Sequence, residues 1–212
     1  MTVHTNSDNS EILNQVREFT ELTIGDIDPK GMCFTICYSL SLYLQFHGID
    51  NTIESGLFDQ EFQHYIISIK DKDQNIIDPT IRQFDSKTPK IYFGKKSPNY
   101  SNFDSIDFLS IYDMWIYPLH HEGWYKPSPP EIGVQPNRCD IRALLKVTFK
   151  SAILLKKLME QRHFISEEHS FRAGKYFEAI QQAYQLYWNS TDNLIQPALL
   201  EEYNVVFTGM KL

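Results

Sequence analysis

The apolar run 34–46 constrains the fold of this chain more than any other segment. It contains no charged residue and ends at His47-Gly48. Apolar residues at helical spacing, followed by a glycine suited to a C-cap, predict a helix over 34–46 with Cys33 at its start. Such a helix must be covered, and the short strands expected downstream offer a sheet on which it can pack. This segment therefore favours an α+β fold built around the cysteine helix.

Two apolar segments after the helix have the composition and turn signals of strands. The first is 64–69, which begins at His64, and the second is 75–77, which is followed directly by Asp78. The charged turn Lys-Asp-Lys-Asp-Gln separates them, so a β-hairpin is the simplest interpretation. Weaker patterns predict a strand at 51–54, a loop at 56–62 and a strand at 90–93.

Helical periodicity also appears at both ends of the chain. The expected helices are 11–22, 138–161, 167–188 and a short one at 197–203. Ser166 followed by Glu167 is a helix start signal for the third of these. The prolines of 126–136 indicate a linker or an extended surface strap. We therefore expect a core domain over 1–125, the strap over 126–136, and a helical part over 137–212 that covers the core or forms a lobe.

Charge and cysteine content exclude several protein classes. The net charge of −7 is opposite in sign to the basic surface of a nucleic-acid-binding protein. We find neither an apolar run of transmembrane length nor the basic and apolar regions of a secretory signal. The 3 cysteines are too few for a disulfide framework and suit a reducing compartment. We expect a cytoplasmic protein, or one exported as an effector without a cleavable signal, with neither membrane nor nucleic acid as partner.

Metal binding finds little support in the sequence. Cys33 and Cys37 have ligand-like spacing, but no second pair stands at the spacing of a zinc site. The adjacent His120 and His121 lack a Glu-x-x-His pattern, and we interpret them as rim residues of an aromatic loop. We expect no metal and no organic cofactor.

Cys33, His64 and Asp78 together have the chemistry of a cysteine acyl-transfer site. A free thiol has a pKa of about 8.5, and a helix N-terminus or a nearby imidazole favours the reactive thiolate. A carboxylate on the far ring nitrogen holds the imidazole in the required tautomer. Taken singly, each residue has an ordinary structural explanation: a buried thiol, a capping histidine and a turn aspartate. Cys37 lies one turn deeper in the helix and is interpreted as a core residue.

The residues that carry a family resemblance follow one another in order. They are Gly31-Met-Cys33, then Leu40, Leu42 and Leu44, then Gly48-Ile49, Gly56, His64 and Asp78-Pro79-Thr80. This pattern resembles the transglutaminase-like cysteine enzymes of the papain-like superfamily, over about residues 28–84. The resemblance implies a cysteine helix packed on a small antiparallel sheet within 1–125. It also implies that Cys33 is the nucleophile, His64 the base and Asp78 the orienting acid.

A second resemblance concerns the stretch from Asp78 to Phe84. Its sequence Asp-Pro-Thr-Ile-Arg-Gln-Phe is similar to that of glutamine-deamidating bacterial toxins and effectors of papain-like fold. In those proteins a glutamine five residues after the aspartate assists the site, which here corresponds to Gln83. The chain departs from many transglutaminase-like proteins by having Ile66 where they have tryptophan, and this departure leaves the subfamily open.

The chemistry implied is acyl transfer through a thioester. The Cys33 thiolate would attack an amide or thioester, free or in a protein or peptide, and the acyl-enzyme would then meet water or an amine. The backbone N–H of Cys33 is one oxyanion donor, and Asn14, Gln15 or Gln83 would supply a second. Glutamine deamidation or amide transfer is the preferred function. The alternatives are a thiol peptidase, or a non-catalytic interaction module on a degenerate scaffold that binds through its helical half.

Overall fold

The computed structural model is of α+β class. The structure describes residues 8–84, 87–106, 141–161 and 166–190. The chain divides into two compact units, Met1–Ile106 and Asp107–Leu212. The boundary expected at 125 and the strap expected over 126–136 lie outside the described residues, as do the aromatic loop and the short helix expected at 197–203.

Two helices open the first unit. Helix α1 spans Asn9–Thr23, and the side chain of Asp8 accepts from the backbone of its first turn. Helix α2 spans Cys33–Phe46 and so begins at the predicted cysteine. The chain leaves α2 through Gly48, whose φ of 77° lies in the left-handed region that favours glycine. The helices predicted over 11–22 and 34–46 are therefore confirmed, with ends that differ by at most two residues.

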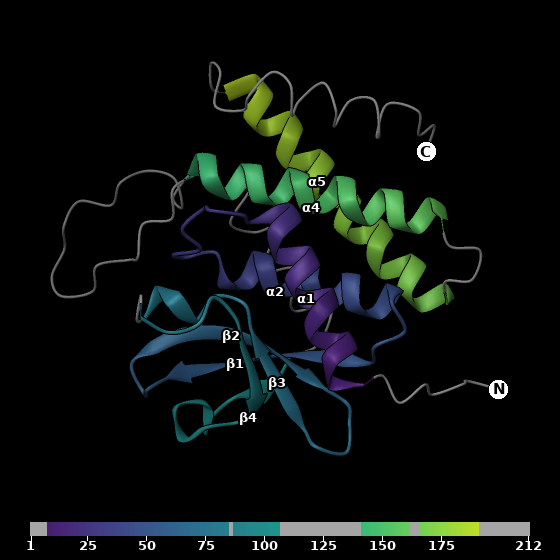
Figure 1. The fold of residues 1–212 in the computed structure, drawn as a ribbon. Coiled ribbons are helices and arrows are strands. Elements are labelled where there is room, and N and C mark those ends of the chain that lie inside the picture. The colour runs from purple at the N-terminus through teal and green to yellow at the C-terminus, as the bar shows by residue number, and fades with distance from the viewer. Residues whose placement is uncertain (1–7, 85–86, 107–140, 162–165, 191–212) are drawn as a thin grey trace, which may run out of the picture. The chain divides into compact units, whose positions relative to one another are not determined.

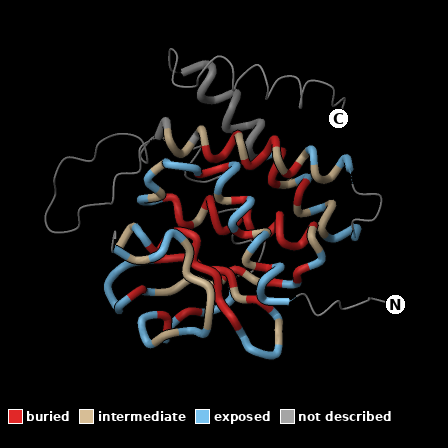
Figure 2. Tube along the Cα trace, viewed as in Figure 1, coloured by how far each residue is buried: buried red, intermediate tan, exposed pale blue. Residues whose placement is uncertain are grey.

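Helix α2 is the central element of this unit. Every residue from Thr35 to Phe46 is buried, as Figure 2 shows by the red stretch of tube. The helix contacts α1 and two strands, and α1 and α2 lie together on one side of the sheet (Figure 1). The ring of Phe34 meets that of Tyr65 edge-on at 5.1 Å. An uncharged helix surface is thus covered on several sides, as its sequence requires.

The sheet is antiparallel and has the strand order β4-β3-β2-β1-β5. The strands are β1 (Asn51–Phe58), β2 (Phe62–Ile69), β3 (Asn75–Asp78), β4 (Tyr92–Lys95) and β5 (Asp104–Ser105). Short 3-10 turns, η1 (Ile81–Gln83) and η2 (Pro98–Tyr100), follow β3 and β4. The predicted hairpin between the second and third strands is confirmed.

The loop predicted over 56–62 is correct only for 59–61, because β1 continues to Phe58 and β2 begins at Phe62. Gly56 pairs with His64 on β2. A Cβ atom at this position would lie 2.4 Å from the carbonyl oxygen of Asn102 and 2.7 Å from the ring of Phe103. Glycine is present here because another segment crosses the strand closely, and this is a long-range cause that local composition does not reveal.

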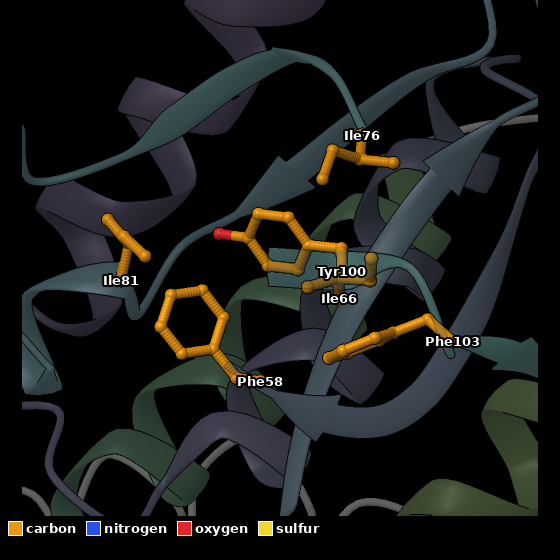
Figure 3. Packing of buried hydrophobic residues seen from close by; sticks show 6 residues of the cluster. All are labelled: Phe58, Ile66, Ile76, Ile81, Tyr100 and Phe103. Atoms are coloured by element: carbon orange, nitrogen blue, oxygen red, sulfur yellow. The ribbon is translucent and has the colours of Figure 1, made fainter. Parts of the chain in front are cut away.

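Alternation along the strands divides the sheet into two buried faces. Ile67 and Ile77 stand opposite each other on one face. The neighbouring residues of β2 and β3 point to the other face, where Figure 3 shows the apolar cluster of Phe58, Ile66, Ile76, Ile81, Tyr100 and Phe103. His64 and Asp78 belong to this second face by the same alternation. The polar site is therefore built into a wall of aliphatic and aromatic side chains.

The second unit contains helix α4 (Ile141–Gln161) and helix α5 (Glu167–Ser190), which contact each other. The hydroxyl of Ser166 accepts from the backbone N–H of His169, so Ser166 caps α5 as predicted. The two long helices expected over 138–161 and 167–188 are confirmed within their described residues. No helix among the described residues has the length and apolar character needed to cross a membrane.

Candidate active site

A buried histidine–aspartate pair forms the centre of the candidate site. Nε2 of His64 lies 2.7 Å from Oδ2 of Asp78, and neither side chain is exposed. His64 stands on β2 and Asp78 ends β3, diagonally across an antiparallel pair in which Ile67 faces Ile77. Such diagonal neighbours on one sheet face are within reach of each other's side chains. The hairpin that the sequence predicts therefore also positions the imidazole on the carboxylate.

Hydrogen bonds satisfy the buried carboxylate of Asp78 on both oxygens. Oδ1 accepts from the backbone N–H of Thr80 at 2.9 Å and from the Thr80 hydroxyl at 3.2 Å. Oδ2 accepts from the hydroxyl of Tyr100 at 2.9 Å, in addition to its bond with His64. Burial and the charge of Asp78 raise the pKa of Tyr100, which therefore remains a donor. These hydrogen bonds compensate the carboxylate for the hydrogen bonds to water that it loses on burial.

Gln83 joins this pair to the start of the cysteine helix. Its Nε2 lies 3.0 Å from Nδ1 of His64 and also donates to the hydroxyl of Thr80 at 3.3 Å. Its Oε1 accepts from the backbone N–H of Gly31 at 3.3 Å. The 3-10 turn after Thr80 places this side chain, and Gly31 lies two residues before the start of α2. The amide of Gln83 thus connects β2 and the segment before α2 to its own turn.

Cys33 is the first residue of α2 and contributes to the pKa of His64. Burial lowers the pKa of His64, but the charge and hydrogen bond of Asp78, and then a hydrogen bond and the charge of Cys33, raise it to about 9. These interactions favour the charged imidazolium. The amide of Gln83 has the opposite effect, because a donor to Nδ1 favours the neutral ring. Cys33 is buried, with 8% of its surface exposed.

Cys37 is a core thiol. Its side chain is fully buried, and its sulfur donates to the backbone carbonyl of Tyr65 at 3.2 Å. Burial, followed by the charges of Asp78 and Cys33, raises the pKa of Cys37 well above its ordinary value. A buried thiol that must stay protonated is inert. Of these two cysteines, Cys33 is the one that contributes both a hydrogen bond and a charge to the pKa of His64.

Three phenylalanines surround the imidazole of His64. The ring centroids of Phe84, Phe58 and Phe103 lie 4.8, 5.8 and 6.2 Å from that of His64, all edge-to-face. Phe58 and Phe84 stack on each other at 4.2 Å. This aromatic wall removes water from the ring, so the interaction between His64 and its polar partners is stronger than it would be in solvent.

The structure does not bring Asn14 and Gln15 to the thiol. Oε1 of Gln15 accepts from the hydroxyl of Tyr43 at 3.1 Å. Tyr43 follows Cys33 by ten residues of the same helix, which corresponds to about 15 Å along its axis. Asn14 is exposed next to Gln15 on α1. Of the three side chains suggested as oxyanion donors, only Gln83 lies at the candidate site.

Two contributors to the site were not identified from the sequence. Tyr100 bonds to Asp78 from a separate turn, and nothing in the local sequence around it signals this contact. The role of Thr80 has a local signal, because a threonine two residues after an aspartate forms the Asx-type turn seen here. Gly31 has a φ of 73°, which glycine tolerates, and its N–H holds Gln83.

The two histidines considered as metal ligands, His120 and His121, lie outside the described residues. Within the described ranges, no group of three or more His, Cys, Asp or Glu residues is arranged to hold a metal ion.

Comparison with protein-family models, with curated proteins and with solved structures finds no significant match for this chain.

Proposed function

We propose that this protein is a cysteine-dependent acyltransferase or amidohydrolase with a transglutaminase-like core. Cys33 is the nucleophile, His64 the acid–base group, and Asp78 the group that orients His64. One observation carries the proposal: a buried imidazole is bonded to Asp78 through Nε2 and is influenced by the thiol of a helix-start cysteine. A structural histidine–aspartate pair has no need of such a thiol beside it.

The ring geometry assigns the roles of the two nitrogens. Because Asp78 occupies Nε2, Nδ1 is the nitrogen that exchanges a proton with Cys33. Transfer of that proton gives a thiolate and an imidazolium, which the buried carboxylate stabilises. The start of α2 adds the partial positive charge of a helix N-terminus at the sulfur.

The reaction then proceeds through two acyl-transfer steps. The sulfur forms a bond to the substrate carbonyl carbon, and the carbonyl π electrons move to oxygen, where the N–H of Cys33 is available as a donor. The C–N bond then breaks, and His64 gives its Nδ1 proton to the departing amine. Water or a second amine attacks the resulting thioester, His64 takes its proton, and the thiol is regenerated.

The substrate class follows from the chemistry of the nucleophile. A thiolate opposite an imidazolium attacks carboxamides and thioesters. The resemblance of 78–84 to glutamine-deamidating proteins favours the side-chain amide of glutamine, free or in a polypeptide, as the acyl donor. The site residues do not distinguish water from an amine as acceptor, because the same groups serve both.

Intact-protein mass spectrometry tests the proposal. The protein is incubated with a panel of donors: a glutamine-containing peptide, a simple peptide amide and an alkyl thioester. We expect an acyl adduct that peptide mapping places on Cys33, absent from Cys33→Ala and retained in Cys37→Ala. The peptide amide arm separates a thiol peptidase from a glutaminyl enzyme. Unmodified Cys33 with every donor, in protein that is folded by circular dichroism, would contradict the proposal.

A further inference from the structure

Gln83 occupies the ring nitrogen that the thiol needs. Its Nε2 lies 3.0 Å from Nδ1 of His64, the same nitrogen that Asp78 leaves for Cys33. We infer that Gln83 is a positioning residue that opposes protonation of His64 at Nδ1 and so raises the pH at which Cys33 becomes a thiolate. This inference rests on the proposed function and adds a means of regulating the same site.

The partners of Gln83 fix which end of its amide faces His64. The backbone N–H of Gly31 can only donate, so it requires Oε1 on its side. The hydroxyl of Thr80 gives its hydrogen to Asp78 and therefore accepts from Nε2 of Gln83. Flipping the amide would set donor against donor at Gly31 and would draw the Thr80 hydroxyl away from Asp78. The NH₂ group therefore faces Nδ1.

An NH₂ group at Nδ1 favours one state of the ring over the others. In the imidazolium, Nδ1 carries a hydrogen that would meet the hydrogens of Gln83. In the neutral ring with hydrogen on Nε2, that hydrogen goes to Asp78 and Nδ1 accepts from Gln83. Asp78 and Gln83 thus select the same neutral tautomer from opposite sides. This tautomer is the one able to take the proton of Cys33.

The charged groups around His64 oppose the effect of Gln83 on the protonation of the ring. Asp78 on β3 and Cys33 on α2 both favour the imidazolium. Tyr100 reaches the ring only through Asp78. The other side chains against the ring are uncharged phenylalanines, Phe58 from β1, and Phe84 and Phe103 from the segments after η1 and η2. The opposing interactions at Nδ1 are therefore the amide of Gln83 and the sulfur of Cys33.

Removing the amide should favour the ion pair. Without the donor of Gln83, the imidazolium forms more readily, and the thiolate that accompanies it forms at lower pH. A hydrogen bond of ordinary net strength corresponds to about half a pH unit to one pH unit. This effect differs from an oxyanion role, in which Gln83 would touch the substrate carbonyl and leave the free enzyme's titration unchanged.

The test measures the pH dependence of Cys33 alkylation by iodoacetamide, in the full chain and without substrate. Wild type is compared with Gln83→Ala and with Gln63→Ala, an exposed glutamine next to His64 on β2. We expect the midpoint for Cys33 to fall by about half a pH unit to one pH unit in Gln83→Ala. It should stay at the wild-type value in Gln63→Ala. An unchanged midpoint in folded Gln83→Ala would overturn the inference.

A second measurement separates this inference from the proposed function. The pKa of His64 is followed by NMR in a Cys33→Ala background, where the thiol no longer contributes. We expect the pKa of His64 to rise on adding Gln83→Ala and to rise further with Gln83→Glu, whose carboxylate accepts from Nδ1–H. A Cys33 that alkylates no faster than an ordinary thiol in wild type would refute the proposed function. If Cys33 is activated but the pKa of His64 does not change when residue 83 is substituted, only the inference about Gln83 is refuted.

Discussion

Nε2 of His64 lies 2.7 Å from Oδ2 of Asp78, and both side chains are completely buried. A buried carboxylate so close to the ring stabilises the imidazolium and fixes its tautomer. Asp78→Asn keeps the shape of the side chain but removes its charge. We expect turnover to fall by about 10³-fold or more, while the fold is retained. The rate of acyl-adduct formation on Cys33 measures this effect, and wild-type rates in Asp78→Asn would exclude Asp78 from the mechanism.

His64 should make the stability of the protein depend on pH. Burial lowers its pKa, but Asp78 and Cys33 raise it overall from an ordinary value of 6.5 to about 9. A raised folded-state pKa gives a stabilisation that is complete below pH 6.5 and is lost as the pH rises through 9. The difference corresponds to on the order of 3 kcal/mol.

Denaturant unfolding at a series of pH values measures this contribution. The free energy of unfolding should decline between pH 6.5 and pH 9 in wild type. The decline should be much smaller in His64→Gln, which has no group that titrates at this position. Parallel pH curves for the two proteins would show that His64 is not charged in the folded state at neutral pH.

Tyr100 supports the site through Asp78. Tyr100→Phe removes one hydrogen bond to a buried charge, which costs about 1.5–3 kcal/mol of unfolding free energy. The matched control is Tyr92→Phe, whose hydroxyl donates to the neutral carbonyl of Lys95 in an exposed setting. That loss should amount to less than about 1 kcal/mol. Thermal unfolding by circular dichroism compares the two variants, and equal losses would remove the case for a structural role of the Tyr100 hydroxyl.

Gly56 should tolerate no side chain. A Cβ at this position would lie 2.4 Å from the Asn102 carbonyl oxygen, and the strand register puts the resulting strain opposite His64. We expect Gly56→Ala to destabilise the protein by about 1–3 kcal/mol and to slow the alkylation of Cys33.

Gly174→Ala is the control for this change, because nothing lies within 4 Å of a Cβ built at that exposed position of α5. The helix propensity of alanine should make this variant neutral or slightly more stable. A Gly56→Ala protein as stable as Gly174→Ala would mean that the segment 102–103 does not cross the strand as described.

Local sequence signals predicted the elements that carry the site. The apolar run 34–46 and the glycine after it gave the bounds of α2 to within one residue at its start. The turn between the two strands gave the hairpin of His64 and Asp78, because hairpin pairing follows from short-range chemistry. The resemblance of 78–84 to glutamine-deamidating proteins predicts Gln83 at the site, and Gln83 does contact His64.

Long-range packing explains what the sequence did not predict. Tyr100 reaches Asp78 from a distant turn, and β5 completes the sheet edge beside β1 with only two residues. Neither contact leaves a local periodicity. Gln15 was suggested as an oxyanion donor by type and position, but it bonds instead to Tyr43 further along α2. Residue type alone does not reveal which part of α2 a given residue of α1 faces.

Competitive alkylation tests the central claim most directly. Wild-type protein is labelled at pH 6 with a limiting amount of iodoacetamide, and each cysteine is quantified by peptide mass spectrometry. We predict that Cys33 reacts at least about ten times faster than Cys37, since only the former has a partner that stabilises its thiolate. We also predict that His64→Ala lowers the alkylation rate of Cys33 to that of an ordinary thiol without unfolding the protein. Equal labelling of Cys33 and Cys37 in the wild type, or a Cys33 rate that is unchanged in His64→Ala, would contradict the account.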